Sequence, residues 1–245
     1  MRLLTWNIHK GIGGLDRRYD IERTLEVLRH HNADVLLLQE VDRGVPRSRR
    51  HDQATLIAER LGYRHVAFTP NVRLREGGYG NALLTRCELL HWENVDLSFP
   101  MKKRRSALHG VLEARVGRHR HRVHVWNVHL GLSGLERSWQ VRRLLGSASM
   151  ASLDARSRLV VAGDTNDWTG ALWPRVLRPA GFELASGRGR TALRSFPAAA
   201  PTGALDKFFL RGPLQRRSCQ RSRLAAARKA SDHLPLILDV DLAPS

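Results

Sequence analysis

Short apolar segments recur along the whole chain, and segments with helical periodicity lie between them. An apolar run of about four to eight residues bounded by turn residues is typical of a strand buried in a layered structure. This alternation therefore favours a strand-rich α/β fold. We predict strands at residues 2–8, 34–41, 81–85, 108–116, 122–130, 158–162, 205–210 and 234–242, and helices at 20–31, 52–61 and 135–153.

Two kinds of strand pattern indicate how these strands are layered. Residues 35–38 are apolar at every position, which is typical of a strand covered on both faces. Residues 123–130 alternate between apolar and polar, so we expect that strand to expose one face. Two packed sheets with helices on the outside accommodate both patterns.

The 245 residues are at the upper end for one domain, and we expect residues 1–245 to form a single domain. No apolar run approaches the roughly 20 residues that cross a bilayer, and the N-terminus lacks a signal-type apolar stretch. A cytoplasmic monomer is the expectation. Cys87 and Cys219 are too few to suggest a secreted disulfide framework, and whether they pair is left open.

The formal net charge of +18 attracts polyanions, so nucleic acid and an anionic phospholipid surface are the natural partners. Genomic base composition explains the arginine content equally well. The basic runs at 43–50, 102–105, 118–122 and 216–223 are expected in exposed loops, where a solvated face is the commoner interpretation.

Several predicted strands end in a polar side chain that interrupts an apolar run. These residues are Asn7, Glu40, His129 and Asp164. A polar group at a buried strand end is costly unless it binds something. One such residue has simple structural explanations, whereas four of them favour a shared site.

The residue types at this site suit a hard cation. Mg²⁺ prefers carboxylate and amide oxygens, which Glu40, Asp164, Asn166 and Asp232 supply. The two cysteines lack metal-site spacing with histidines, so a zinc centre is not expected. Phosphoester hydrolysis also needs an oriented water and positive groups near the phosphate, and His129 and His233 are candidates.

Read in order, seven motifs resemble the endonuclease/exonuclease/phosphatase superfamily, which has the deoxyribonuclease I-like fold. They are Thr5-Trp6-Asn7-Ile8-His9-Lys10-Gly11, Leu38-Gln39-Glu40-Val41, Gly80-Asn81-Ala82-Leu83-Leu84, Asn127-Val128-His129-Leu130, Gly163-Asp164-Thr165-Asn166, Leu205-Asp206-Lys207-Phe208 and Ser231-Asp232-His233-Leu234-Pro235. The resemblance covers nearly the whole chain. It implies a four-layer α-β-β-α sandwich, two mixed sheets flanked by helices, with a metal site at one edge.

The resemblance also implies roles. Glu40 would be the main ligand of Mg²⁺, with Mn²⁺ as an alternative, and Asn7 and Asp232 would assist it. Asp164 would orient or deprotonate the attacking water, and Asn166, on the same side of an extended segment, would donate to a phosphoryl oxygen.

In the same resemblance, His233 would act as a base or phosphate contact, with Asp206 fixing its tautomer and favouring its charged form. Asn81 matches a position near the rim of the site. Arg105 is a further candidate for binding substrate phosphate, as a bidentate donor.

His129 separates branches of the superfamily, because abasic-site endonucleases usually carry a different motif there. The segment Asn127-Val128-His129-Leu130 is similar to the deoxyribonuclease and sphingomyelinase branch of small bacterial proteins. A resemblance to the branch that removes tyrosyl adducts from DNA ends rests only on Gly163-Asp164-Thr165-Asn166 and Phe208-Phe209.

Three functions follow from the sequence. The first is a Mg²⁺-dependent nuclease, and the second is a phospholipid or sphingomyelin-type phosphodiesterase or phosphatase at an anionic membrane. The third is a non-catalytic basic binding module. Filled motif positions argue against the third, and the lack of a strong membrane-docking segment favours the nuclease over the second.

Overall fold

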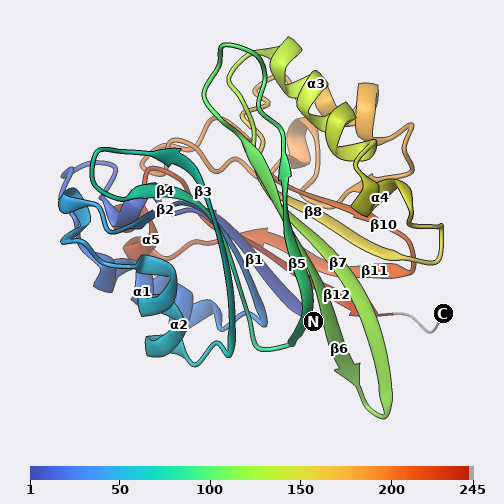
Figure 1. The fold of residues 1–245 in the computed structure, drawn as a ribbon, viewed down its shortest axis with the longest axis horizontal. Helices are drawn as coiled ribbons and strands as arrows, with labels where there is room; N and C mark the ends of the chain where they lie inside the picture. The colour runs from blue at the N-terminus through green and yellow to red at the C-terminus, as the bar shows by residue number, and fades with distance from the viewer. Residues whose placement is uncertain (243–245) are drawn as a thin grey trace.

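Two six-stranded mixed sheets form the centre of the structure, a computed structural model that describes residues 1–242 (Figure 1). The first sheet has the order β11-β12-β1-β2-β4-β3 and the second the order β5-β6-β7-β8-β10-β9. Parallel pairs occur between β1 and β2 and between β7 and β8, and the other neighbours are antiparallel. The predicted fold class, two packed mixed sheets flanked by helices, is confirmed.

The elements have the following bounds. The first sheet contains β1 (Arg2–Asn7), β2 (Val35–Arg43), β3 (His65–Arg73), β4 (Gly78–Thr85), β11 (Leu214–Arg221) and β12 (Leu236–Leu242). The second contains β5 (Glu88–Asp96), β6 (Ser106–Val116), β7 (His119–His129), β8 (Arg158–Asp164), β9 (Glu183–Leu184) and β10 (Asp206–Arg211). The helices are η1 (His9–Gly11), α1 (Ile21–His31), η2 (Pro46–Ser48), α2 (Gln53–Leu61), α3 (Gly134–Leu145), α4 (Ala148–Ala151), η3 (Trp173–Leu177), η4 (Gly189–Thr191) and α5 (Ala225–Ala230).

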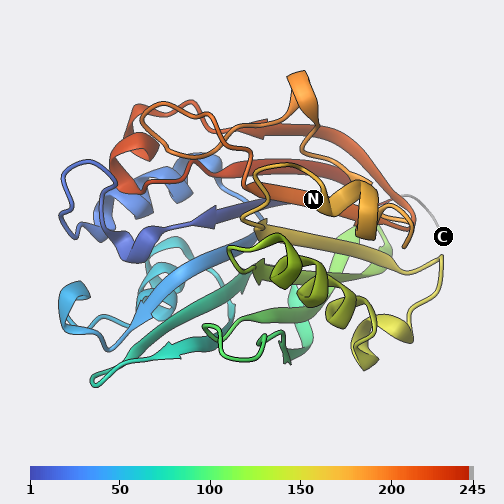
Figure 2. The same cartoon turned by 90° about the horizontal axis from the view of Figure 1, so that it is seen from above.

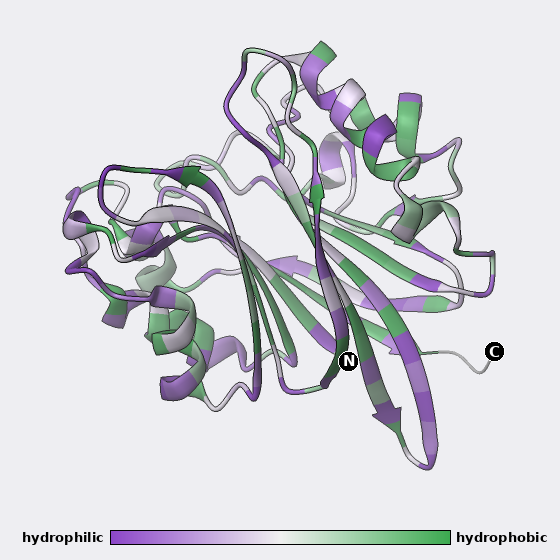
Figure 3. Ribbon diagram, in the orientation of Figure 1, coloured by the Kyte–Doolittle hydropathy of each residue, from purple (hydrophilic) through white to green (hydrophobic). Residues whose placement is uncertain are grey.

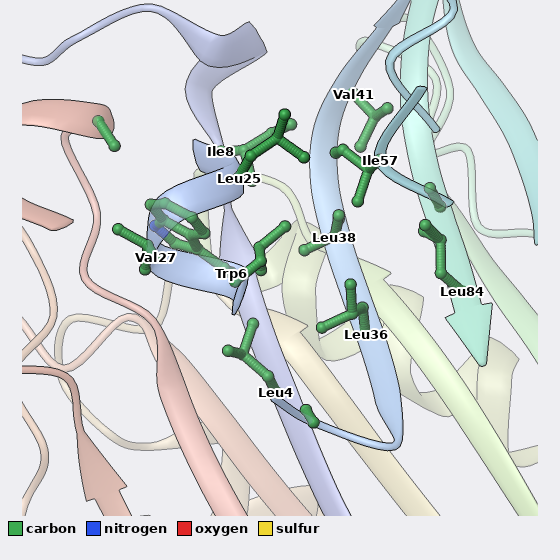
Figure 4. Close-up of a cluster of buried hydrophobic side chains, with 14 of the residues drawn as sticks. Leu4, Trp6, Ile8, Leu25, Val27, Leu36, Leu38, Val41, Ile57 and Leu84 are labelled. Atoms are coloured by element: carbon green, nitrogen blue, oxygen red, sulfur yellow. The ribbon is translucent and has the colours of Figure 1, made fainter. Parts of the chain in front are cut away.

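Three apolar layers hold the sheets and helices together. One lies between the first sheet and α1, α2 and α5, and includes Leu4, Trp6 and Leu25 (Figure 4). A second lies between the two sheets, and a third separates the second sheet from α3 and α4. Figure 3 shows the hydrophobic residues concentrated in the central strands. Because successive strand residues face opposite sides, Leu3 packs between the sheets while Leu4 packs under the helices.

Helix ends follow local sequence signals. The side chains of Asp20, Asp52 and Ser133 accept backbone N–H groups in the first turns of α1, α2 and α3, respectively. Asn32 and Gly62 adopt left-handed conformations after α1 and α2, which is the usual way to end a helix. None of the described helices is both long enough and apolar enough to cross a membrane.

The strands that the sequence did not predict are the edges of the sheets. They are β3, β5, β9 and β11. An edge strand pairs on one side only and often carries charged residues, which weakens its apolar pattern. In β5, for example, most residues are exposed or half-buried.

Other local predictions also need correction. The predicted helix 135–153 is two helices, α3 and α4, interrupted near Gly146 and Ser147. Much of the basic runs 118–122 and 216–223 lies in strands β7 and β11 instead of loops. The helix α5 was not predicted. Cys87 and Cys219 are both free.

The layer under the helices predicts a stability difference between two leucines. Leu36 is fully buried in β2, whereas Leu90 on the edge strand β5 is 42% exposed. Leu36→Ala is expected to lower the free energy of unfolding by about 2–5 kcal/mol, because it removes buried methyl groups and leaves a cavity. The control Leu90→Ala should cost about 0.5 kcal/mol or less. Denaturant unfolding measures both, and equal losses would contradict the assignment of Leu36 to the core.

Candidate active site

The strand alternation brings polar side chains from both sheets together between the sheets. On β1, Leu3 packs between the sheets, and Asn7 lies on the same face at the end of the strand. On β8, Val160 packs between the sheets as Leu3 does, and Asp164 ends the strand. Both polar residues are buried, and Asn7 Nδ2 donates to Asp164 Oδ2 at 3.0 Å. The predicted proximity of these strand ends is therefore present.

A buried pair of amide side chains joins the sheets directly beneath this site. Gln39 Nε2 on β2 donates to Asn127 Oδ1 on β7 at 2.7 Å. Asn127 Nδ2 donates in turn to the carbonyl oxygens of Leu38 and Ala82, both at 2.8 Å. Gln39 and Asn127 have no exposed surface. These hydrogen bonds fix the strand ends of one sheet relative to those of the other.

His233 is held by hydrogen bonds to its ring and to its backbone. Its Nδ1 lies 2.8 Å from Asp206 Oδ2, which is the contact that the sequence predicted. The same carboxylate oxygen accepts from Ser195 Oγ at 2.5 Å. The backbone oxygen of His233 accepts from Trp6 Nε1 at 2.8 Å. The ring is thereby positioned with its Nε2 facing Asp164.

One carboxylate oxygen is the meeting point of the site. Asp164 Oδ2 lies 3.6 Å from His129 Nε2 and 3.7 Å from His233 Nε2, in addition to its bond from Asn7. The other oxygen, Oδ1, accepts from the backbone N–H of Asn166 at 3.0 Å. Asp164 is 2% exposed, so these groups replace most of its water.

The two histidines differ in charge although they face the same carboxylate. Burial would lower the pKa of His233, but the charges of Asp206 and Asp164 raise it to about 10. Burial and the positive charge of Arg105 instead lower the pKa of His129 to about 4. At neutral pH His233 is therefore a cation and His129 is neutral. Burial would raise the pKa of Asp164, but the histidines beside it lower the value overall.

Glu40 leaves the regular strand pattern. The register between β2 and β4 shifts between Leu38 and Val41, and Glu40 has a left-handed φ of 54°. Its carboxylate contacts Lys10 Nζ, from η1. Burial would raise the pKa of Glu40, but His129 and Lys10 hold it at about 2. Glu40 is therefore an ionised carboxylate whose charge needs a cationic partner.

The predicted metal ligands fit a hard cation in their chemistry. Glu40 and Asp232 offer carboxylate oxygens and Asn7 offers an amide oxygen. Both carboxylates lie near His9, which is 3.8 Å from Asp232 Oδ1 and contributes to the field at Glu40. The side chain of Asp232 is 33% exposed, which leaves it open to solvent.

A second group of ligand atoms is less suited to a cation. Those of Asp164, Asp206 and His233 lie within 4.8 Å of one another. His233 Nδ1 bonds Asp206, and Asp164 Oδ2 accepts from Asn7, so two of these ligand atoms already have partners within the protein. We interpret this group as a proton-handling set.

Asn166 differs from its prediction in conformation. Its φ of 51° is left-handed, so residues 164–166 are not an extended segment. The side-chain Nδ2 donates to the carbonyl of Leu130 at 2.9 Å, which leaves one N–H for another acceptor. Asn166 is adjacent to Asp164 through the backbone bond described above, so the two predicted residues are together in the site.

The two predicted substrate contacts have different outcomes. Asn81 is fully buried and donates to the carbonyl oxygens of Ser106 and Asn127, so it links the sheets and does not lie at the rim. That prediction is corrected, because the residue faces the same inter-sheet layer as Gln39. Arg105 is half-buried, and its Nε has no hydrogen-bond partner among the described residues. It lies close enough to affect the pKa of His129.

The sequence interpretation missed several residues of the site. Lys10, Gln39, Asn127 and Lys207 all stand inside motifs that it quoted, and Ser195 stands outside them. Lys207 is buried and donates to the carbonyl oxygens of Asp167 and Ala204 at 3.0 and 2.5 Å. Alternation along the strands could have found Gln39 and Asn127, because each lies two residues after a residue that packs between the sheets, Leu37 and Val125. No local signal pointed to Ser195.

Comparison with known proteins identifies the family of the chain. A sequence model of the Endonuclease/Exonuclease/phosphatase family matches residues 4–233. The chain belongs to this family. Its members are generally hydrolases of phosphoric esters and are typically dependent on divalent metals.

Individual relatives of this family member are similar over most of their length. An uncharacterized protein of Escherichia coli K12, YbhP, is 29% identical over 251 residues, which cover 98% of this chain and 96% of YbhP. An endonuclease/exonuclease/phosphatase from Beutenbergia cavernae superposes with a TM-score of 0.80 and 25% identity, covering 99% of this chain and 72% of that one. The catalytic domain of human Nocturnin, solved with a sulfate anion, gives a TM-score of 0.77 at 23% identity, with 99% and 94% covered.

Because Asp206 and Asp164 flank His233, we expect its ring to have a raised pKa in metal-free protein. In EDTA, the His233 ring should remain protonated at pH 7 and titrate near pH 10, and Asp206→Asn should move the titration toward 6.5. Because the pKa is raised on folding, its contribution to stability is fully present below pH 6.5 and is lost as pH rises through about 10. NMR of the histidine ring measures this. A wild-type ring that titrates near pH 6.5 would contradict the arrangement.

Proposed function

We propose that the protein is a divalent-metal-dependent phosphodiesterase that hydrolyses nucleic acid. The observation that carries the proposal is the convergence of Asn7, His129 and His233 on Asp164 Oδ2, beside the ionised Glu40. Phosphoester hydrolysis needs a carboxylate that orients water and cations that face the phosphate oxygens. These groups come from both sheets and are held by buried hydrogen bonds.

In this proposal Asp164 accepts a hydrogen bond from the attacking water and receives its proton as the water attacks phosphorus. The P–O bond to the leaving nucleotide breaks, and the leaving oxygen takes up a proton from solvent. The remaining N–H of Asn166 donates to a phosphoryl oxygen. His233 carries its positive charge toward the phosphate through Nε2, while Asp206 holds Nδ1–H and so maintains that orientation. Ser195 positions Asp206.

The cation would be held by Glu40, Asn7 and Asp232, because these residues provide oxygen ligands and Asp232 is open to solvent. When bound, Mg²⁺ or Mn²⁺ supplies polarisation of a phosphate oxygen and neutralises its charge. Lys10, which contacts Glu40, keeps that carboxylate ionised.

Nucleic acid is proposed as substrate because of the charge distribution as well as the chemistry. The net charge of +18 concentrates a polyanion around the protein, and Arg105 lies beside His129 with one donor unused among the described residues. A guanidinium in that position suits a phosphate oxygen of the chain being cleaved.

Activity of site variants tests the catalytic roles. Asp164→Asn and His233→Ala are each expected to lower turnover of plasmid DNA by about 100- to 10,000-fold, which is the usual contribution of a positioned acid or base. Glu40→Ala and added EDTA should abolish Mg²⁺-dependent turnover. The control Arg118→Ala, on the exposed turn between β6 and β7, should leave it unchanged. Activity that survives in Glu40→Ala or His233→Ala would overturn the assignment.

A phospholipid phosphodiesterase is the second candidate function. Leu132 and Leu135 follow the strand end at His129 and are 75% and 84% exposed, which is unusual for leucine and suits contact with a lipid surface.

A substrate panel separates the two functions. Plasmid DNA, abasic duplex, sphingomyelin vesicles, bis-p-nitrophenyl phosphate and the monoester p-nitrophenyl phosphate are each assayed with Mg²⁺ and with EDTA. The nuclease proposal expects turnover of plasmid DNA and of the small diester, and Leu132→Ser/Leu135→Ser protein should retain it. Turnover of sphingomyelin but not DNA, lost in the leucine variant, would instead support the lipid enzyme. Turnover of phosphomonoesters alone would contradict both.

A further inference from the structure

A groove with a volume of about 850 Å³ lies at the same edge of the sheets as the candidate active site. Its lining residues come mainly from the ends of β3 and β4, from β5 and from the loop between β5 and β6. Figures 1 and 2 show where these elements lie in the fold. Its lining is basic and aromatic, and no carboxylate of the described residues belongs to it. The lining residues that matter here are Arg47, Phe68, Arg73, Tyr79, Trp92 and Lys103.

Tyr79 connects the groove with the candidate active site. Its ring lies on the groove wall, with Lys10 Nζ 5.3 Å from the ring centre, and Lys10 contacts Glu40. Both Glu40 and Arg105 influence the pKa of Tyr79, so they lie within electrostatic range of it. The groove is therefore next to the proposed cation site, because Lys10 contacts both Tyr79 and Glu40.

The cations of the groove are not equivalent. Arg47 is paired with the buried carboxylate of Asp42 at 2.8 Å, which offsets its charge. Arg73 and Lys103 are exposed and have no ion pair with any described carboxylate. They come from different sheets, since Arg73 ends β3 and Lys103 lies in the loop between β5 and β6. An uncompensated cation from each sheet in one groove favours a polyanion as its ligand.

Trp92 provides an exposed aromatic face beside these cations. It is 45% exposed on the edge strand β5, and no described ring or cation packs on it. Phe68 is covered by contrast, since the guanidinium of Arg43 lies 5.4 Å from its ring centre. An exposed indole face in a groove that is also lined by cations is a surface on which a nucleic-acid base can stack.

We propose that this groove binds a single-stranded segment of the polynucleotide that flanks the cleaved bond. A base stacks on Trp92, while Arg73 and Lys103 contact backbone phosphates. Interleaved aromatic and basic side chains are the usual means of holding single strands, because every base has a face that can stack. In a duplex the base faces are covered by neighbouring bases, so Trp92 selects unpaired nucleotides. This inference rests on the proposed function and specifies its substrate class.

Binding of a fluorescein-labelled thymidine oligonucleotide of about twenty nucleotides, measured by anisotropy in EDTA, tests the groove without hydrolysis. Trp92→Ala should weaken binding about tenfold, and Trp92→Phe should restore most of the affinity. Arg73→Ala/Lys103→Ala should reduce the slope of log K against log salt by about 1.4, because two phosphate contacts on a single strand are lost.

The matched control is Arg118→Ala/Arg122→Ala, which removes two exposed positive charges from the hairpin between β6 and β7 at the other end of the sheets. It should reduce the slope less than the groove variant does. Thermal unfolding verifies that each variant is folded. A duplex of the same length should bind more weakly than the single strand and lose little affinity in Trp92→Ala protein.

The outcomes separate this inference from the proposed function. Equal binding by wild type, Trp92→Ala and Arg73→Ala/Lys103→Ala overturns the groove assignment, as does a wild type that does not bind the oligonucleotide. Variants that lose binding only to phosphatidylserine vesicles also overturn it, in favour of a lipid surface. A wild type that binds the oligonucleotide through Trp92 but hydrolyses neither DNA nor bis-p-nitrophenyl phosphate would refute the enzyme and retain the groove.

Discussion

The hydrogen bond between Gln39 and Asn127, with those from Asn127 to the carbonyls of Leu38 and Ala82, is the interaction on which the site depends. Apolar packing between two sheets is not directional, so by itself it does not hold polar groups at hydrogen-bonding distances. Buried amide groups have strict geometry, and breaking their hydrogen bonds without water is expensive. By joining β2 to β7, the pair sets the distance between Glu40 on one sheet and His129 and Asp164 on the other.

The charges at the site depend on this placement. Asp164 and Asp206 are buried carboxylates on neighbouring strands, and His233 lies between them with its proton retained. His129 faces the same Asp164, but burial and, to a smaller extent, the charge of Arg105 lower its pKa, so it stays neutral. Two histidines of ordinary chemistry therefore have different protonation states, because their neighbours differ and because burial strengthens the effect of each neighbour.

The sequence predicts the central strands and the site motifs well, because both leave strong local signals. A buried strand such as β8 is a run of apolar residues, and Asp164 at its end breaks the run. The edge strands β3, β5, β9 and β11 were not predicted, because an exposed edge has no need of an apolar pattern. The left-handed backbone of Glu40 and Asn166 is likewise absent from local patterns, because neither residue type requires it.

By itself, the sequence determined which residues are candidates for the chemistry and which of them end buried strands, because strand alternation and polar strand ends are properties of neighbouring residues. Only the tertiary structure decided which groups meet. It brought Ser195 onto Asp206 and Lys10 onto Glu40, and it turned Asn81 into a link between the sheets. It also placed Trp92 beside Arg73 and Lys103 in one groove. These contacts join residues from different elements, and their energies depend on burial and on distance, which the order of residues does not specify.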